Sequence, residues 1–104
     1  MKKIYVAKRI GEWEIIDILV SDSIEDAEYY ARRDRNHLTH RERYKCQHFV
    51  YAYEVPDCVI DMESFSNLQE QNCCDPYDCW IVYTKEELLN LADNLDWDIT
   101  NENE

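Results

Sequence analysis

The side chains that could do chemistry gather in one short stretch, QNCCDPYDCW, at positions 71–80. The chemistry would be that of thiols, of which the whole chain has five: Cys46, Cys58, Cys73, Cys74 and Cys79. A structural zinc site usually shows two pairs of Cys or His ligands separated by a spacer, and no second pair follows here. A redox pair would need Cys-x-x-Cys at the start of a helix. We therefore expect reduced thiols and no metal, with the cysteines in or beside strands packed as small apolar side chains.

No other pattern predicts catalysis. Cys46 and His48, two residues apart, can point to the same side of a strand, which leaves zinc binding by a Cys/His pair as an open alternative. His37 and His40 lie between helical segments and are weak candidates for ligands or bases. Gly11 is the single glycine, which excludes the glycine-rich loops that bind phosphate. We expect no enzymatic activity and no cofactor.

The apolar pattern predicts one α+β domain over residues 1–98 and a frayed acidic tail over 99–104. We expect an antiparallel or mixed sheet of four to five strands with two helices packed on one face, in the order ββα(α)β(β)βα. The strands are predicted at residues 4–7, 13–20, 48–55 and 79–83, with a short optional strand at 58–62. Gly11 is expected to take a positive φ in the first hairpin turn. The stretch IIDILV, apolar on both faces, predicts that the second strand is central in the sheet.

Hydroxyl side chains placed three residues before an acid predict where the helices begin. These capping pairs are Ser23 with Asp26, Thr39 with Glu42, and Thr84 with Glu87. They predict a helix over residues 24–35, a short helical turn after residue 39, and a final helix with the apolar stripe Leu88, Leu91, Ala92 and Leu95. Pro56 is expected to end the third strand, and residues 63–78 to form a loop with a turn at Asp75-Pro76.

The charge is distributed unevenly along the chain. Residues 1–50 hold ten Lys and Arg against nine Asp and Glu, whereas residues 51–104 hold only Lys85 against fourteen acids. The positive charge of the first half is itself concentrated at Arg32, Arg33, Arg35, Arg41, Arg43 and Lys45. The chain is therefore predicted to be an electrostatic dipole with a basic ridge and an acidic half. Carboxylates without nearby cations repel one another, which destabilises the fold unless a basic partner compensates.

The acidic half is the predicted binding surface. Its expected partner-binding residues are Asp75, Asp78, Glu86, Glu87, Asp93, Asp96 and Asp98, with the aromatic residues Tyr77 and Trp97; Asp57 and Asp61 extend the same surface. In size and acidity the chain resembles the small phage proteins that disarm bacterial defences: anti-CRISPR proteins, anti-restriction DNA mimics and uracil-DNA glycosylase inhibitors. The resemblance implies a non-enzymatic inhibitor or adaptor. It would dock on the basic nucleic-acid-binding groove of a partner such as a CRISPR effector or a restriction enzyme.

An alternative function uses the basic ridge. Arg32, Arg33, Arg35, Arg41 and Arg43 could bind a phosphate-bearing ligand, such as a signalling nucleotide or RNA, with Tyr29 or Tyr44 stacked on the base. The net charge of −12 argues against direct binding to duplex DNA. No signal-peptide core and no apolar run of about 20 residues occurs, so we expect a cytoplasmic protein that does not enter membranes. Opposite charges on two faces also favour a homodimer.

Overall fold

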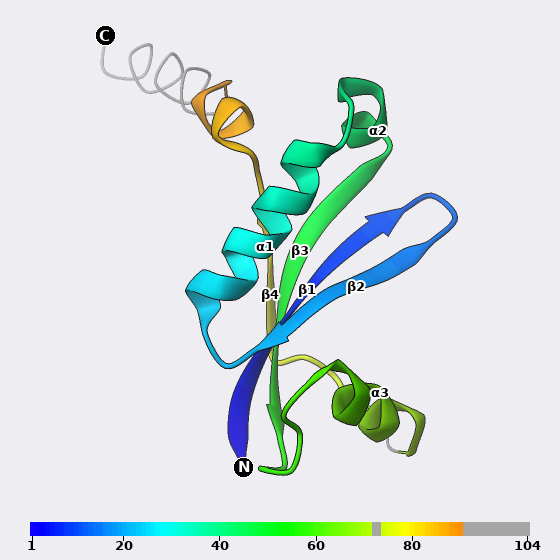
Figure 1. Ribbon diagram of the computed structural model, residues 1–104, viewed down its shortest axis with the longest axis vertical. Coiled ribbons are helices and arrows are strands. Elements are labelled where there is room, and N and C mark those ends of the chain that lie inside the picture. The colour runs from blue at the N-terminus through cyan, green and yellow to red at the C-terminus, as the bar shows by residue number, and fades with distance from the viewer. Residues whose placement is uncertain (72–73, 91–104) are drawn as a thin grey trace, which may run out of the picture.

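Two ten-residue strands, β1 (Lys2–Gly11) and β3 (Cys46–Val55), form the centre of the sheet and pair antiparallel along their whole length. They are flanked by β2 (Ile15–Ser21) and β4 (Asp78–Val82), which gives the strand order β2-β1-β3-β4 (Figure 1). This computed structural model describes residues 1–71 and 74–90. The predicted α+β class and the four-stranded antiparallel sheet are confirmed.

The sheet has a helix on each face. The helices are α1 (Ile24–His37), α2 (His40–Tyr44) and α3 (Met62–Gln71), and residues 85–90 are also helical. Successive strand residues point to opposite faces, so Val6 and Ala7 belong to different cores. The α1 core contains Ala7, Ala27, Ala31, Val50 and Val82; the α3 core contains Ile4, Val6, Tyr53, Val55, Val59 and Phe65. The helices α1 and α3 therefore lie on opposite faces of the sheet, and α3 belongs to a segment that the sequence predicted to be a loop.

The capping pairs predicted from the sequence form at α1 and α2. Ser23 Oγ accepts a hydrogen bond from the Asp26 N–H, 3.3 Å away, at the start of α1. At α2, Thr39 Oγ1 accepts from the Glu42 N–H, and the Glu42 carboxylate accepts from the Thr39 N–H. These bonds satisfy N–H groups that have no partner inside the helix. Both helices accordingly begin where the sequence predicts.

The segment after β3 differs from the prediction. The optional strand at residues 58–62 does not form, and the expected loop contains helix α3. Asp61 caps this helix, because its carboxylate accepts from both the N–H and the hydroxyl of Ser64. Phe65 and Leu68, three residues apart, then face the core. The local signals for this helix were therefore an Asp cap and a short apolar spacing.

The first hairpin also differs from the prediction in two respects. Gly11 has no positive φ; its N–H donates to the Glu14 carbonyl, 2.8 Å away, and closes a turn between β1 and β2. The strand β2 is an edge strand, not a central one. It is apolar on both sides because Leu19 packs in the α1 core and Val20 in the α3 core, although only β1 pairs with it. Helices on both faces can thus give an edge strand the composition of a central one.

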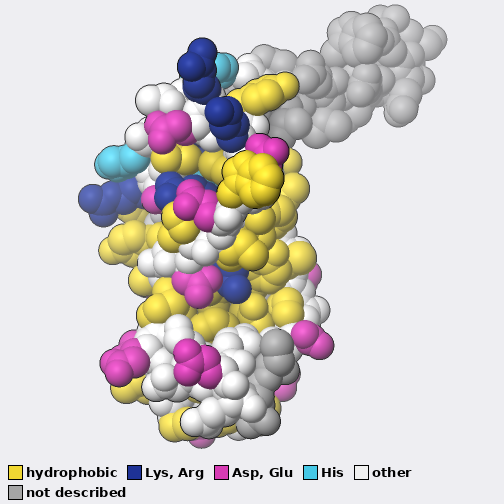
Figure 2. Space-filling model, turned by 90° about the vertical axis from the view of Figure 1, so that its right-hand side faces the viewer, with side chains coloured by type: hydrophobic (Ala, Val, Ile, Leu, Met, Phe, Trp, Pro, Cys, Tyr) yellow, Lys and Arg dark blue, Asp and Glu magenta, His cyan; other side chains and the backbone are white. Residues whose placement is uncertain are grey.

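Most of the cations lie at one end of the sheet. The end where β1 begins, which we call the acidic end, carries Lys2 and Lys3 among many acids: Asp22, Glu25, Asp26, Glu54, Asp57, Asp61, Glu63, Glu70, Asp75 and Asp78. The opposite end, which we call the basic end, carries Arg9, Arg32, Arg33, Arg35, Arg41, Arg43, Lys45 and Lys85, together with the acids Glu12, Glu14, Asp34, Glu42, Glu86 and Glu87. On the face shown in Figure 2, Lys and Arg gather in the upper part and only acidic charges appear in the lowest third. Within residues 1–71 and 74–90, no helix is long and apolar enough to cross a bilayer.

Candidate functional site

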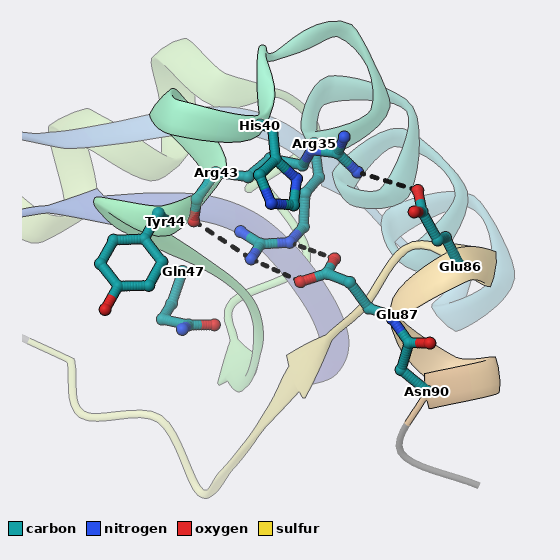
Figure 3. Close-up of a pocket in the computed structure, with 8 residues that line it drawn as sticks. All are labelled: Arg35, His40, Arg43, Tyr44, Gln47, Glu86, Glu87 and Asn90. Carbon is teal, nitrogen blue, oxygen red and sulfur yellow. Dashed lines mark hydrogen bonds and ion pairs between the residues drawn. The ribbon is translucent and has the colours of Figure 1, made fainter. Parts of the chain in front are cut away.

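A shallow pocket of about 270 Å³ at the basic end brings predicted acidic and basic residues into contact (Figure 3). It is lined by Arg35, His40, Arg43, Tyr44, Gln47, Glu86, Glu87 and Asn90. The Arg35 guanidinium donates from Nε to Glu87 Oε1 (2.6 Å) and from Nη2 to Glu87 Oε2 (2.8 Å). Such a two-point bond between Arg and a carboxylate is among the stronger hydrogen-bonded pairs in proteins. Two residues that the sequence assigned to opposite surfaces thus bind each other.

Arg35 is the hub of this contact. Its guanidinium is 3% exposed, and its remaining donors reach the carbonyls of Cys46 (3.1 Å) and Arg43 (3.3 Å) and the Nδ1 atom of His48 (3.2 Å). A guanidinium has five N–H groups, so every donor has an acceptor. Arg35 therefore joins α1 to α2, to β3 and to the helical segment 85–90, and it has no donor left for a ligand.

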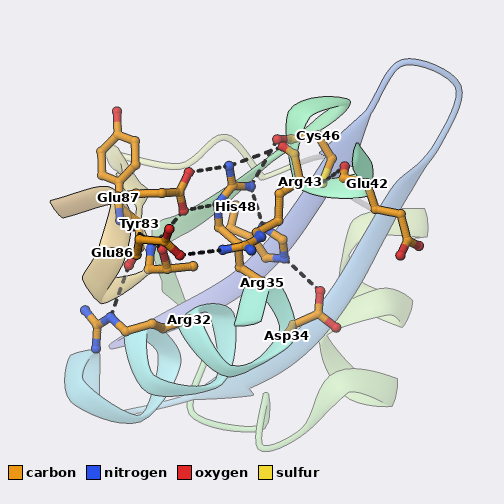
Figure 4. A network of polar contacts seen from close by, with 11 residues as sticks. Arg32, Asp34, Arg35, Glu42, Arg43, Cys46, His48, Tyr83, Glu86 and Glu87 are labelled. Atoms are coloured by element: carbon orange, nitrogen blue, oxygen red, sulfur yellow. Dashed lines mark hydrogen bonds and ion pairs between the residues drawn. The ribbon is translucent and has the colours of Figure 1, made fainter. Parts of the chain in front are cut away.

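A buried histidine extends the network (Figure 4). Arg35 can only donate, so His48 Nδ1 accepts and the ring proton lies on Nε2, which donates to Asp34 Oδ2 at 2.7 Å. The same Asp34 oxygen accepts from Arg9 Nη1 at 3.1 Å. Burial lowers the pKa of His48, although its bond to Asp34 partly opposes that effect. His48 is 0% exposed and both of its nitrogens are engaged, so it cannot act as a base on a ligand.

Glu87 completes the network and caps the last helical segment. Thr84 Oγ1 accepts from the Glu87 N–H (3.1 Å), and Glu87 Oε1 accepts from the Thr84 N–H (3.0 Å), as the sequence predicts for this capping pair. The bond from Arg35 is the main reason that the pKa of Glu87 falls to about 2. Leu88, the first residue of the predicted apolar stripe, is 45% exposed, and Leu91, Ala92 and Leu95 lie outside the described residues.

The five arginines of the predicted basic ridge do not form one open surface. Arg35 is buried, and Arg32 Nε donates to the Tyr83 carbonyl at 3.2 Å. Arg43 Nη1 lies 3.9 Å from Glu86 Oε2, and its Nε is buried with no hydrogen-bond partner in the part of the chain that the structure describes. Of these five arginines, only Arg33 and Arg41 are exposed. Binding of a phosphate ligand by the whole ridge would require these internal contacts to break.

The predicted acidic surface is also divided. Glu86 and Glu87 lie at the basic end, next to Arg43 and Arg35. The predicted residues that lie exposed at the acidic end are Asp57, Asp61, Asp75, Tyr77 and Asp78. The others, Asp93, Asp96, Trp97 and Asp98, lie outside the described residues, as does the predicted tail 99–104. The reason for the division is that the five residues of β4 separate Asp78 from residues 85–90.

A compact acidic surface forms around the start of β4, and we call it the acidic edge: Glu54, Asp75, Tyr77 and Asp78. The Tyr77 N–H donates to the Ala52 carbonyl (2.8 Å), and Asp78 is the register partner of Ala52, so both lie close to Glu54. Partial burial, the Tyr5 hydroxyl and the charges of Glu54 and Asp78 raise the pKa of Tyr77. Lys3 Nζ lies 5.6 Å from the centroid of this ring. The tyrosine is 51% exposed and has charges of both signs near it.

The cysteines do not gather into a site in the described part of the chain. No group of three or more His, Cys, Asp and Glu side chains there is placed to hold a metal ion. Cys46, Cys58, Cys74 and Cys79 are free thiols, and Cys73 lies outside the described residues. Cys58 and Cys79 are exposed, contrary to the expectation that they pack as apolar residues. Cys46 Sγ lies 3.4 Å from the Glu42 carbonyl, while His48 contacts Arg35 and Asp34, so these two side chains have separate partners.

Sequence reasoning missed the buried polar network, although a signal for it was present. Ala27, Ala31 and Arg35 recur at intervals of four, which places an arginine in line with the two alanines that α1 turns toward the sheet. A charged residue on the inner face of a helix needs buried partners. Comparisons with protein-family models, with curated proteins and with solved structures found no match.

Proposed function

We propose that this protein is a non-enzymatic inhibitor or adaptor of the cytosol that docks its acidic edge on a basic nucleic-acid-binding groove of a partner protein. The partner would be a CRISPR effector or a restriction enzyme, as for the small acidic phage proteins that the chain resembles. The observation that carries the proposal is the set of exposed carboxylates around the start of β4. Glu54, Asp75 and Asp78 have no ion pair within the described residues, whereas Glu86, Glu87 and Asp34 contact arginines.

Unpaired carboxylates raise the energy of the free protein through mutual repulsion, and a cationic partner removes that repulsion. The acidic edge also presents an exposed tyrosine, a residue type enriched at the energetic centres of interfaces. Charge complementarity of this kind increases association rates and selects the partner. With a net charge of −12, the chain would compete with nucleic acid for a basic groove and would not bind the duplex itself.

The test compares two charge reversals of equal size. Asp75→Lys with Asp78→Lys changes the acidic edge, and Glu12→Lys with Glu14→Lys changes the exposed turn between β1 and β2. Each variant would be titrated into purified CRISPR effectors and restriction enzymes bound to labelled duplex DNA, with displacement of the DNA read by gel mobility. For a partner that the wild type inhibits, we expect the acidic-edge variant to lose about 100-fold in potency and the turn variant to change little.

Equal potency of the two variants would contradict the proposal, because it would mean that net charge and not the acidic edge determines binding. Failure of the wild type to displace DNA from any enzyme of the panel would contradict the proposed class of partner.

A further inference from the structure

His48 is a titratable side chain that the fold encloses completely. Its ring is 0% exposed and lies between two charged residues of α1: Nδ1 is 3.2 Å from Arg35 Nη1, and Nε2 is 2.7 Å from Asp34 Oδ2 (Figure 4). The strands beside it place Arg9 of β1 and the apolar Val82 of β4 in register with it. The charges that act on the ring are those of Asp34, Arg35 and Arg9. The proton that this ring could take up therefore has to enter an existing network of charges.

The charges of the network balance only while His48 is neutral. With a neutral ring, Arg9 is paired with Asp34, and Arg35 is paired with Glu87. A proton on Nδ1 would add a third cation to two carboxylates, and the new N–H would face an N–H of Arg35 where an acceptor is required. An uncompensated charge in a buried site is strongly unfavourable. Protonation of His48 is therefore incompatible with the present position of Arg35.

Arg35 also attaches two outer parts of the basic end to α1. Its guanidinium donates to the Arg43 carbonyl in α2 and to both carboxylate oxygens of Glu87 in the last helical segment. These two parts bury few apolar side chains: α2 has no buried residue, and Leu88 and Leu89 are 45% and 65% exposed. Segments with few buried contacts open at a lower cost in free energy than the whole fold. A displacement of Arg35 therefore acts on the two parts that are easiest to detach.

We propose that protonation of His48 releases α2 and the last helical segment from the end of α1, while the sheet and its two cores stay intact. When Arg35 moves away from the protonated ring, the Arg43 carbonyl and the Glu87 carboxylate lose a donor that holds them. The two cores consist of hydrophobic side chains and lie beneath α1 and α3. The acidic edge is at the opposite end of the sheet, so the release is independent of the proposed docking.

The pH range of the release follows from the ordinary pKa of histidine. In the open arrangement His48 contacts water and has its usual pKa of 6.5, whereas burial lowers its pKa in the closed arrangement. The open state therefore binds a proton more readily, and its population should rise by up to about tenfold for each pH unit below 6.5. Glu87 stays ionised in this range, because its pKa is about 2. The release is thus distinct from the loss of the Glu87 charge at lower pH.

Amide hydrogen exchange of the full-length protein, followed by NMR at pH 7.5 and 5.5, tests the release. The rates are corrected for the intrinsic effect of pH on exchange. The reporters are two N–H groups of the parts that open: that of Arg43, which donates to the Thr39 carbonyl, and that of Leu88, which donates to the Thr84 carbonyl. We expect the protection of both to fall by roughly fivefold to tenfold between the two pH values.

Low concentrations of urea distinguish this local release from unfolding of the whole chain. A local opening exposes little surface, so the protection of Arg43 and Leu88 should respond weakly to urea. The control is the N–H of Val50, a residue that is 0% exposed in the central strand β3. We expect the N–H of Val50 to be more protected at both pH values and to respond more steeply to urea.

His48→Gln identifies the group that takes up the proton. Glutamine keeps a donor and an acceptor but does not titrate, so the effect of pH on Arg43 and Leu88 should disappear. The matched controls are His37→Gln and His40→Gln, because both histidines are exposed at the same end of the sheet and should leave the effect unchanged. The ring nitrogen shifts of wild-type His48 give a check that needs no variant: the proton should lie on Nε2 at pH 7.5.

Four results would overturn the proposal. Protection of Leu88 that is equal at pH 7.5 and 5.5 would show that the proton releases nothing. A urea response of Leu88 as steep as that of Val50 would show that only the whole chain opens. An effect of pH that persists in His48→Gln would assign the proton to another group. A proton on Nδ1 at pH 7.5 would remove the contact with Arg35 on which the release depends.

Discussion

The bond between Arg35 and Glu87 gives the most quantitative prediction. The carboxylate of Glu87 is 27% exposed, and its pKa is lowered from 4.5 to about 2. At neutral pH this lowering of the pKa corresponds to roughly 3 kcal/mol. Glu87→Gln keeps the size of the side chain and an acceptor for the Thr84 N–H but removes the charge. We expect it to lower the free energy of unfolding by about 3 kcal/mol at pH 7, a large part of the total for a domain of this size.

The pH dependence distinguishes this charge from other effects of the substitution. Because the folded pKa is lowered, the contribution of Glu87 is complete above pH 4.5 and is lost as the pH falls toward 2. At pH 3 we expect less than half of it to remain. Urea unfolding followed by tryptophan fluorescence at pH 7, 5 and 3 measures the difference between variant and wild type.

The matched control for this experiment is Glu86→Gln, the neighbouring glutamate. Its side chain is 72% exposed and lies 3.9 Å from Arg43, a geometry that contributes little. We expect a change within about 0.5 kcal/mol at every pH. Two results would show that the Arg35 network does not stabilise the fold as we infer. One is a loss of unfolding free energy for Glu87→Gln at pH 7 that is no larger than the loss for Glu86→Gln. The other is a loss for Glu87→Gln that is no smaller at pH 3 than at pH 7.

Two further predictions concern buried side chains. Burial lowers the pKa of His48, so the unfolded chain binds a proton more readily than the folded one. Stability should therefore fall as the pH drops below 6.5, by at most about 1.4 kcal/mol per pH unit, and His48→Gln should flatten this slope in urea titrations. Parallel slopes for variant and wild type would contradict the assignment. Phe65→Ala removes a side chain that is 1% exposed and should lower the free energy of unfolding by about 3–5 kcal/mol, whereas Leu89→Ala, at a position 65% exposed, should lower it by under about 1 kcal/mol in thermal unfolding. Equal losses would argue against α3 as part of the core.

The parts of the fold that could be predicted are those with local causes. Ser23 and Thr39 place caps that form as expected, and β3 ends at Val55, just before Pro56. The helix α3 escaped prediction because its cap is Asp61 and its buried residues are few. The position of β2 could not be inferred from its composition, because burial of both faces depends on helices from elsewhere in the chain.

The functional site was harder to predict because oppositely charged residues that are far apart in the sequence lie together in the fold. Glu87 lies in the acidic half of the sequence and Arg35 in the basic ridge, yet β4 carries Glu87 to the end of the sheet where α1 finishes. A separation of 52 positions gave no local sign of this pairing. What the sequence did indicate correctly is the excess of acids between Cys46 and Thr84, where no lysine or arginine occurs.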